Sequence, residues 1–505
     1  MFDSFKEHSI AEFFKKNRHM LGFSGKIRSL TTVIHEYVTN SLDACEEAGI
    51  LPYIKVEIQS IGDKYKVVVQ DNGPGIPKEL IGKALGQMLA GTKFHRYMQQ
   101  RGQQGIGAAG CTMFSLLTTG KPIHVISAHN GTAVSCDVSI DFKTNKPVVK
   151  NIVERPATFH GLIIEGFFGD VKFDKGQYGP LEYIKRTAIA NPHATIELVT
   201  PDGEKYLFKR STDKLPQKPK EVKPHPLGIG PHDLIEFAKI SSAKKLSSFL
   251  INDFSRVTQK KVNELKELLP DIDFNKDPKT LSWQEAERIV KAIHKIKWIA
   301  PQTDAVIPIG KEQIEKSLNN VLRPQFVTVV ERQPKIYRGG IPFIVEVGIA
   351  YGLTDKSFPF KGSVMRFANR APLLFDAAGC GITQAVKSID WKRYNIQNFN
   401  EEPIAIFVNL SSVHVPYVSA GKQAIANEEE IVKEIKNGIM EAARTIKTFI
   451  RKRYRAKEIE KKRKALLRYV NRLSEDLAAL SGFSQEELKQ KLMQLVEERY
   501  KLGGG

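Results

Sequence analysis

The chain has 505 residues, of which 76 are Lys or Arg and 56 are Asp or Glu, so its formal net charge is +20. This length exceeds what one hydrophobic core can organise, and we expect two to four domains. With 41% hydrophobic and 26% charged residues and no apolar run near eighteen residues, we expect a soluble protein rather than a disordered or membrane-spanning one. Met1–Glu7 does not have the pattern of a signal peptide.

The four cysteines are typical of a protein kept in a reducing compartment. They stand far apart in the sequence, and no pair has the spacing of metal ligands. We therefore expect a cytosolic protein in which they are reduced core residues: Cys45, Cys111, Cys136 and Cys380.

The first third of the chain mixes helices and strands. Residues 1–20 contain a short amphipathic segment, Ile10–Lys16, and are expected to form an N-terminal strap. Apolar and polar residues alternate over Tyr53–Ile58, and the valine-rich run Tyr65–Gln70 also has a strand pattern, which predicts two paired strands. Further strands are predicted over 123–127 and 161–165.

A helix is predicted around residues 36–43, and it carries a polar stripe. Glu36, Asn40 and Asp43 have the spacing i, i+4, i+7 and share one helix face. This places a carboxylate able to act as a base beside an amide oxygen able to hold a hard cation. A zinc-protease motif beginning at His35–Glu36 is excluded, because its second histidine position is Thr39.

An acidic residue ends the second predicted strand and is followed by a glycine turn, Asp71–Pro77. Gly73 and Gly75 allow the backbone to approach a ligand closely, and Asp71 can accept a hydrogen bond from a buried group. Taken alone, the segment could equally be a plain hairpin turn.

A glycine-rich loop follows at Arg101–Gly110, with four glycines in nine residues. Backbone N–H groups of such a loop, together with the N-terminus of a helix over 108–117, can bind phosphate oxygens. The loop lacks the Gly-Lys-Ser/Thr of a Walker A motif and the strand context of a dinucleotide fingerprint.

In this order and spacing, the three motifs resemble the Bergerat (GHKL) ATP-binding fold of gyrase-type ATPase subunits, MutL, ninety-kilodalton heat-shock chaperones and sensor histidine kinases. The resemblance implies ATP and Mg²⁺ as cofactors, Glu36 as general base and Asn40 as the Mg²⁺ ligand. It implies that Asp71 binds the adenine amino group. The remaining implied ATP-binding residues are Asp43, Gly73, Gly75, Thr92, Lys93, and the phosphate lid Gly102, Gln103, Gln104, Gly105, Ile106, Gly107 and Ala108. One departure is Gly161–Leu162, where the family usually has Gly-Thr.

The rest of the chain divides into three more parts. A proline-rich stretch, Lys214–Pro226, predicts a boundary; residues 227–300 are mostly helical, and residues 301–440 return to mixed strands and helices. The tail is helical and basic: Glu441–Arg468 holds twelve Lys or Arg against three Glu. Such a segment can track phosphates, although a solvated helix face is the alternative.

Several later segments resemble the B subunits of DNA topoisomerase VI, a type IIB enzyme. They are Tyr183–His193, Lys223–Pro226, Phe249–Val257, Arg366–Leu374, Trp391–Tyr394 and Pro416–Lys422. The resemblance implies an α+β multidomain fold: a strap (1–20), a GHKL ATPase α/β sandwich (21–225), a helix-two-turns-helix insert (226–300), an α/β transducer domain related to ribosomal protein S5 (301–440) and a basic helical arm (441–505).

The same resemblance assigns further site residues. Lys422 is implied to be a catalytic and ATP-binding lysine that reaches the γ-phosphate from the transducer domain. Arg186, Lys392, Arg393 and Tyr394 are candidate DNA contacts. Trp391 could contact DNA or anchor its loop in the core, and the Gln259–Lys261 segment of the insert is expected to be a solvated face.

The implied activity is that of an ATP-operated clamp. Two copies would dimerise through the ATPase domains when ATP binds, and would join two A subunits, which carry the DNA-cleaving tyrosine, in an A₂B₂ heterotetramer. The assembly would pass one double-stranded DNA through another in the nucleoid, with no membrane partner. A GHKL chaperone, a mismatch-repair ATPase, a sensor kinase and a non-enzymatic nucleotide-binding scaffold remain alternatives.

Overall fold

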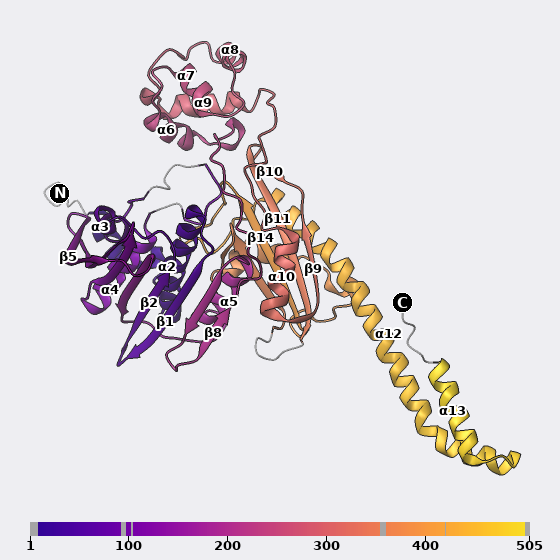
Figure 1. Ribbon diagram of the computed structural model, residues 1–505. Helices are drawn as coiled ribbons and strands as arrows, with labels where there is room; N and C mark the ends of the chain where they lie inside the picture. Colours follow the sequence, from indigo (N-terminus) through magenta and orange to yellow (C-terminus); the bar gives the residue numbers. More distant parts are fainter. Residues whose placement is uncertain (1–8, 92–96, 103–104, 354–359, 420, 500–505) are drawn as a thin grey trace, which may run out of the picture.

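The computed structural model describes residues 9–91, 97–102, 105–353, 360–419 and 421–499. The chain forms an α/β unit, a small helical unit, a second α/β unit and a long C-terminal helix that leaves the body (Figure 1).

The N-terminal unit is built on an eight-stranded sheet in the order β5-β4-β3-β6-β2-β1-β7-β8. Neighbours are antiparallel except β1 and β7, which are parallel. Its strands are β1 (Tyr53–Ile61), β2 (Lys64–Asp71), β3 (Ile123–His129), β4 (Thr132–Asp141), β5 (Lys146–Pro156), β6 (Gly161–Phe168), β7 (Thr195–Val199) and β8 (Lys205–Phe208). Its helices are α1 (Ile10–Lys16), η1 (Arg18–Leu21), α2 (Lys26–Ala48), α3 (Lys78–Gly86), α4 (Gly107–Thr119) and α5 (Pro180–Ala190).

Alternation along the strands decides which face of this sheet is covered. Ile54, Val56 and Ile58 of β1 are fully buried, and they lie beside Val67 and Val69 of β2 in the predicted antiparallel pairing. Because alternate side chains point to one face, these residues pack under α2 and α4 and leave the other face to solvent. The prediction that the two segments pair is confirmed.

The helical insert has a hydrophobic core of its own, separate from the rest of the molecule. It contains η2 (Pro226–Gly228), α6 (Pro231–Ile240), α7 (Leu246–Asp253), α8 (Gln259–Leu268), η3 (Pro278–Thr280) and α9 (Trp283–Ile293). Ser282 and Glu285 form a capping box that begins α9, as their spacing favours. Figure 1 shows this unit standing above the two sheets.

The second sheet lies in residues 301–440, with strand order β10-β11-β14-β12-β13 and with β9 also paired to β11. Its elements are α10 (Lys311–Leu322), β9 (Pro324–Glu331), β10 (Lys335–Tyr337), β11 (Ile341–Leu353), β12 (Ser363–Ala368), β13 (Ala371–Pro372), η4 (Ala377–Gly379), α11 (Gly381–Lys387), η5 (Trp391–Tyr394) and β14 (Ile404–Ser412).

The two α/β units are packed together by α5 and α10. Ile184 and Ile189 of α5 belong to the same core cluster as Ile314 and Leu318 of α10. Ser317 donates a hydrogen bond to the Ile189 carbonyl oxygen at 2.8 Å. The interface is therefore a continuous apolar contact with its polar groups paired.

The C-terminal part consists of α12 (Glu429–Ser481) and α13 (Gln485–Arg499), which folds back against α12 (Figure 1). The predicted arm boundary at 441 falls inside α12, because the helix begins at Glu429. Isoleucines continue to pack on the second sheet as far as Ile450. We therefore propose that the arm begins after Ile450.

All four cysteines are buried and unpaired, as predicted. Within the described residues, no helix is both long and apolar enough to cross a membrane.

Candidate nucleotide site

Three motifs predicted from the sequence meet around one cavity of about 360 Å³. Glu36 and Asn40 line it from α2, and Asp71 and Gly75 from the end of β2 and the turn after it. The glycine loop and the start of α4 contribute Gly102, Gly105, Ile106, Gly107 and Ala108. This volume is within the range of small-molecule sites. Three motifs that are separate in the sequence therefore line one pocket in the structure.

The carboxylate of Glu36 lies against the N-terminus of α4. A methyl group built on Gly107 would stand 1.8 Å from Glu36 Oε2, so any side chain there would displace the Glu36 carboxylate. The first amides of α4 have no carbonyl partner within the helix and carry the positive end of its dipole. A carboxylate and the positive end of a helix are therefore in contact.

Asn40 offers its side chain to the cavity. It is exposed and forms no hydrogen bond within the described residues. An amide oxygen that is not already engaged is a suitable ligand for a hard cation such as Mg²⁺. In the part of the chain that the structure describes, no group of three or more His, Cys, Asp or Glu side chains could hold a metal ion.

Asp71 is buried, and both of its oxygens accept hydrogen bonds. Ser41 Oγ donates to Oδ2 at 2.6 Å, and the amides of Gly73 and Leu162 donate to Oδ1 at 2.9 Å and 3.1 Å. Burial raises the pKa of Asp71, and these three donors partly oppose that effect. The hydroxyl expected on β6 is absent at Leu162, and Ser41 of α2 supplies one instead.

Gly73 and Gly75 shape the pocket in different ways. Gly73 uses its amide to hold Asp71, whereas Gly75 adopts a positive φ of +70°. A Cβ at Gly75 would lie 2.3 Å from the Ala128 carbonyl oxygen, so the turn packs directly on β3. The positive φ and the close approach of Gly75 require glycine, whereas the amide that Gly73 donates is one that any residue except proline has.

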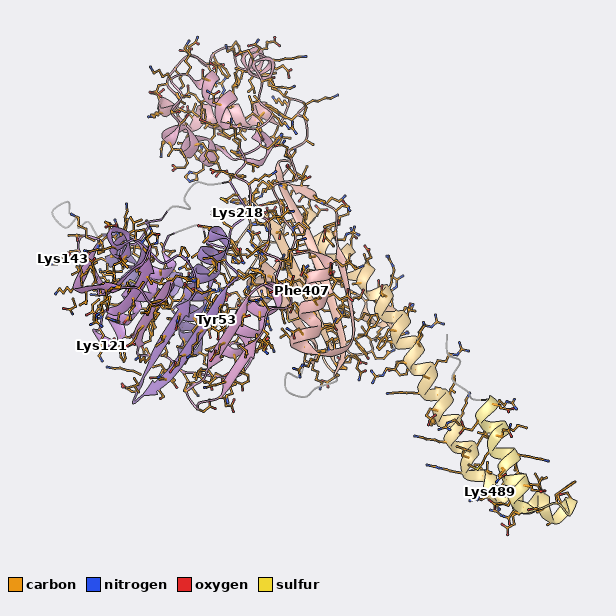
Figure 2. The ribbon with its side chains drawn as sticks, in the orientation of Figure 1. Tyr53, Lys121, Lys143, Lys218, Phe407 and Lys489 are labelled. Carbon is orange, nitrogen blue, oxygen red and sulfur yellow. The ribbon has the colours of Figure 1, made fainter. Side chains whose placement is uncertain are left out.

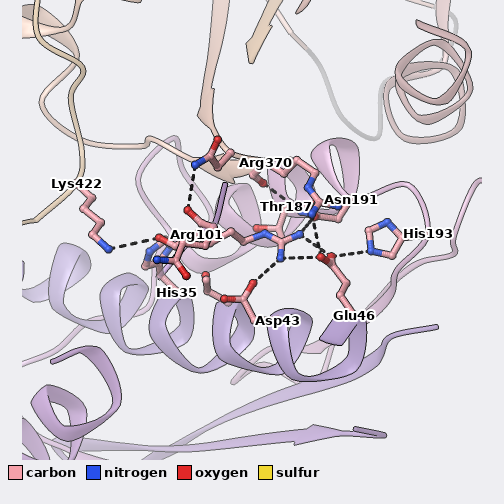
Figure 3. Close-up of polar contacts among 12 residues, drawn as sticks. His35, Asp43, Glu46, Arg101, Thr187, Asn191, His193, Arg370 and Lys422 are labelled. Carbon is pink, nitrogen blue, oxygen red and sulfur yellow. Dashed lines mark hydrogen bonds and ion pairs between the residues drawn. The ribbon is translucent and has the colours of Figure 1, made fainter. Parts of the chain in front are cut away.

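Asp43 does not line the cavity, which corrects its predicted role as an ATP-binding residue. It is buried and forms an ion pair with Arg101, whose Nη1 lies 2.6 Å from Asp43 Oδ1 (Figure 3). The helical spacing placed it near Glu36 and Asn40 on α2, but its carboxylate is engaged by Arg101. Asp43 therefore anchors the glycine loop.

Lys422 reaches the cavity from the second α/β unit. It has φ +52°, an unusual conformation for a lysine, and its Nζ donates to the Arg101 carbonyl oxygen at 3.4 Å. Burial is the main reason that the pKa of neighbouring His35 is lowered; Glu36 raises it, and Lys422 lowers it further. A cation from one unit and a base from the other thus lie in one pocket.

The DNA-contact candidates are divided by the structure. Arg186 is buried, pairs with Glu182 at 2.6 Å and donates to the Val364 carbonyl oxygen. It is not available to DNA, and its prediction as a DNA contact is wrong, because the i, i+4 carboxylate and the domain interface enclose it. Trp391 is buried too, which decides between its two predicted roles in favour of anchoring the loop.

Lys392 and Arg393 are exposed and Tyr394 is half-buried. The adjoining Asn395 and Gln397 border a groove of about 510 Å³ with Arg451, Lys452 and Arg455 of α12. Four predicted site residues, Thr92, Lys93, Gln103 and Gln104, lie outside the described residues.

Sequence reasoning missed Ser41, Glu46, Arg101 and Arg370, all of which support the site. Arg101 stands directly before the glycine loop, which was the one local signal for it. The others are ordinary helix or turn residues whose partners come from distant parts of the chain.

This architecture defines a class of protein. A helix with a Glu/Asn face, an Asp–glycine turn and a glycine loop on a mixed sheet are the parts of a GHKL ATPase. Residues 25–144 match the family described as histidine kinase-, DNA gyrase B-, and HSP90-like ATPase, and residues 301–473 match the transducer of the topoisomerase VI B subunit.

Curated relatives narrow the class. The chain is 46% identical to the B subunit of type 2 DNA topoisomerase 6 from Pyrococcus horikoshii, over 99% of this chain and 96% of that protein. The corresponding proteins of Pyrococcus abyssi and Methanothermobacter thermautotrophicus are 45% and 46% identical, over 99% of this chain and 96% and 97% of theirs. The chain belongs to the family of type 2 DNA topoisomerase 6 B subunits.

Among solved structures, the ATPase region of Saccharomyces cerevisiae topoisomerase II is similar to 89% of this chain and to 99% of that chain, with 13% identity and a TM-score of 0.42. This likeness is too weak to add to the assignment.

Proposed function

We propose that the chain is the ATP-binding and ATP-hydrolysing B subunit of a type IIB DNA topoisomerase. The observation that carries this proposal is the shared pocket: Glu36 of the ATPase domain and Lys422 of the transducer domain line one cavity at the N-terminus of α4. A nucleotide bound in the ATPase domain would therefore contact the transducer domain as well.

Glu36 is the general base in this proposal. Its carboxylate takes a proton from the water that attacks the γ-phosphate in line, while the free amides of α4 and the glycine loop hold phosphate oxygens. Asp71 accepts a hydrogen bond from the adenine amino group. Its Oδ1 already accepts two hydrogen bonds, whereas Oδ2 accepts one, from Ser41, and can accept another.

Lys422 places its ammonium beside the same pocket and offsets the charge that develops on the transferred group. Asn40 would hold Mg²⁺, which supplies neutralisation of phosphate charge when it is bound. Because Lys422 comes from the transducer, its contact with the nucleotide also reports nucleotide state to that domain.

The partners follow from the family and from the charge distribution. We propose an A subunit that makes the double-strand break, an A₂B₂ assembly, and dimer closure through the ATPase domains when ATP binds. The basic side chains of α12 and the adjoining Lys392 and Arg393 face solvent and would contact the DNA duplex that is passed.

The test is relaxation of supercoiled plasmid by this chain with its A subunit, with and without ATP. Activity is expected only with both subunits and ATP. Glu36→Ala should abolish ATP hydrolysis and relaxation but keep ATP binding, because the base contributes to the chemical step rather than to binding.

Glu79→Ala is the matched control, since Glu79 is an exposed carboxylate on α3 of the same domain. It should leave both activities unchanged. Full turnover by Glu36→Ala would reject the assigned base, and relaxation by this chain alone would reject the division of labour between subunits.

A further inference from the structure

The short segment that leads into the glycine loop, Tyr97–Gly102, is attached along its length to the transducer domain. The Gln99 amide pairs with the backbone of Ile307: its Nε2 donates to the carbonyl oxygen at 2.9 Å, and its Oε1 accepts from the Ile307 amide at 2.6 Å. Gln99 is only 4% exposed, so these bonds are shielded from water.

Three further transducer residues hold the same segment. Asn369 Nδ2 donates to the Gln100 carbonyl oxygen at 3.0 Å, and Lys422 Nζ donates to that of Arg101 at 3.4 Å. At the other end, the Tyr97 ring stacks on His414, with centroids 6.1 Å apart. Tyr97, Gln99, Gln100 and Arg101 of the segment thus each contact the transducer domain.

The side chain of Arg101 ends this segment in a buried ion cluster (Figure 3). Its guanidinium pairs with Asp43 and with Glu46, each at 2.6 Å, and donates to Asn191. Both carboxylates lie on α2, the helix that carries Glu36. Arg101 therefore connects the glycine loop to the catalytic helix.

Arg370 brings the transducer into the same cluster. Its Nη2 lies 2.9 Å from Glu46 Oε2, and its carbonyl oxygen accepts from Asn191 Nδ2 at 3.2 Å. His193 Nε2 contacts Glu46 Oε1 at 2.8 Å. Two guanidinium groups thus face two carboxylates, and the cluster is balanced when His193 is neutral.

The burial of these groups and the charges around them agree with this balance. Burial lowers the pKa of His193, which keeps the imidazole neutral. Burial alone would raise the pKa of Glu46, but Arg101, Arg370 and His193 hold it well below its usual value. Glu46 is therefore a half-buried carboxylate, paired on both oxygens, that joins Arg101 to Arg370.

We propose that Gln99, Asn369 and Arg370 are positioning residues that fix the entry of the glycine loop on the transducer domain. When the transducer moves relative to the ATPase domain, the loop moves with it, and so does Lys422. This proposal rests on the proposed function of the cavity as the ATP site. It adds Gln99, Asn369 and Arg370 to Lys422 as connections between the phosphate loop and the transducer.

The test uses the full chain assembled with its A subunit and three variants: Arg370→Gln, Arg370→Lys and Ser317→Ala. Ser317→Ala is the interface control, because it removes the buried bond to Ile189 and does not touch residues 97–102. The readouts are kcat and KM for ATP, the unfolding temperature, and hydrogen exchange of the amides of residues 97–102 without nucleotide.

Arg370→Gln should lower kcat by about tenfold or more and accelerate exchange in residues 97–102, because a small displacement of a catalytic loop is costly. Arg370→Lys keeps a cation next to Glu46 and should stay within about threefold of the parent on both readouts. Ser317→Ala should leave kcat and the exchange of residues 97–102 unchanged, even if it lowers the unfolding temperature as much as Arg370→Gln does.

The proposal is overturned when Arg370→Gln behaves like Ser317→Ala in hydrolysis and exchange. It is overturned equally when Arg370→Lys is no better than Arg370→Gln, since the charge would then not matter. Hydrogen exchange is measured without nucleotide, so it tests the positioning role even if the parent protein hydrolyses no ATP. Absence of ATP hydrolysis by the parent protein would instead reject the proposed function.

Discussion

At the scale of single residues, the site depends on how closely backbone and side chain approach each other. Gly107 is the sharpest case, because its Cα faces the Glu36 carboxylate with no room for a methyl group. Gly107→Ala should displace Glu36 and lower kcat for ATP by about a hundredfold, with the fold retained. Steady-state hydrolysis and nucleotide titration measure this.

Gly110 provides the matched control in the same helix. A Cβ there would meet Leu21 and Phe23 at 3.5 Å, an ordinary contact distance. Gly110→Ala should therefore hydrolyse ATP normally and gain about 0.5–1 kcal/mol of stability from helix propensity. Equal losses in the two alanine variants would show that α4 tolerates no side chain and that the Glu36 contact is not the reason.

At the scale of elements, the start of α10 is held by a buried acid on β11. Glu346 accepts hydrogen bonds from the Gly310 amide and from Asn409 Nδ2, each at 2.8 Å. Burial raises the pKa of Glu346 from 4.5 to about 7, and the charge of Glu331 on β9 adds to that shift. Since α10 packs on α5, this acid supports the domain interface.

The sign of the pH effect follows from that shift. Between 4.5 and about 7 the folded state keeps a proton that the unfolded state loses, so stability from Glu346 is complete below 4.5 and falls as pH rises to about 7. The loss amounts to roughly 3 kcal/mol. Native-state exchange of β11 amides should show the parent protein losing stability relative to Glu346→Gln as the pH rises across this range. Glu79→Gln, at an exposed carboxylate, is the control. A stability difference between parent and Glu346→Gln that does not vary with pH would contradict the prediction.

At the scale of the whole molecule, the positive charge is set apart from the ATP site. Beyond Ile450, α12 leaves the body and carries exposed lysines and arginines into solvent, as Figure 2 shows along the lower right of the view. This arrangement favours a role in which the arm binds a polyanion, while the nucleotide binds separately in the cavity at the two α/β units.

The expected signature is the salt dependence of DNA binding. Lys452 and Arg455 are exposed and border the groove beside η5. Replacing both by Gln should lower the slope of log affinity against log salt by about 2, because each phosphate contact releases about one counterion. Titration of duplex DNA at several salt concentrations measures it.

Lys143 and Lys146, at the turn between β4 and β5, provide a control pair on the far side of the molecule (Figure 2). Replacing them by Gln should leave the slope unchanged. If both double variants lower the slope equally, binding is spread over the whole basic surface and the arm has no special role.

Much of the site could be predicted because it depends on local periodicity. The spacing of Glu36 and Asn40 fixes them on one helix face, and Asp71 follows a valine-rich run that is typical of a strand. Asp43 and Arg186 were assigned wrongly for the opposite reason. Whether a charged side chain faces a ligand, DNA or a buried partner depends on residues far away in the chain, here Arg101 for Asp43, and for Arg186 the domain interface that encloses it at the Val364 carbonyl.

The sequence by itself therefore determined the class of fold, the order of the domains and the motifs of a nucleotide site, because periodicity and glycine placement act over a few residues. Only the tertiary structure decided that Lys422 lies in the same cavity as Glu36, and that Tyr97–Gly102 is bound to the transducer. Such contacts join residues hundreds of positions apart, and their partners are set by how the two sheets pack rather than by any local pattern.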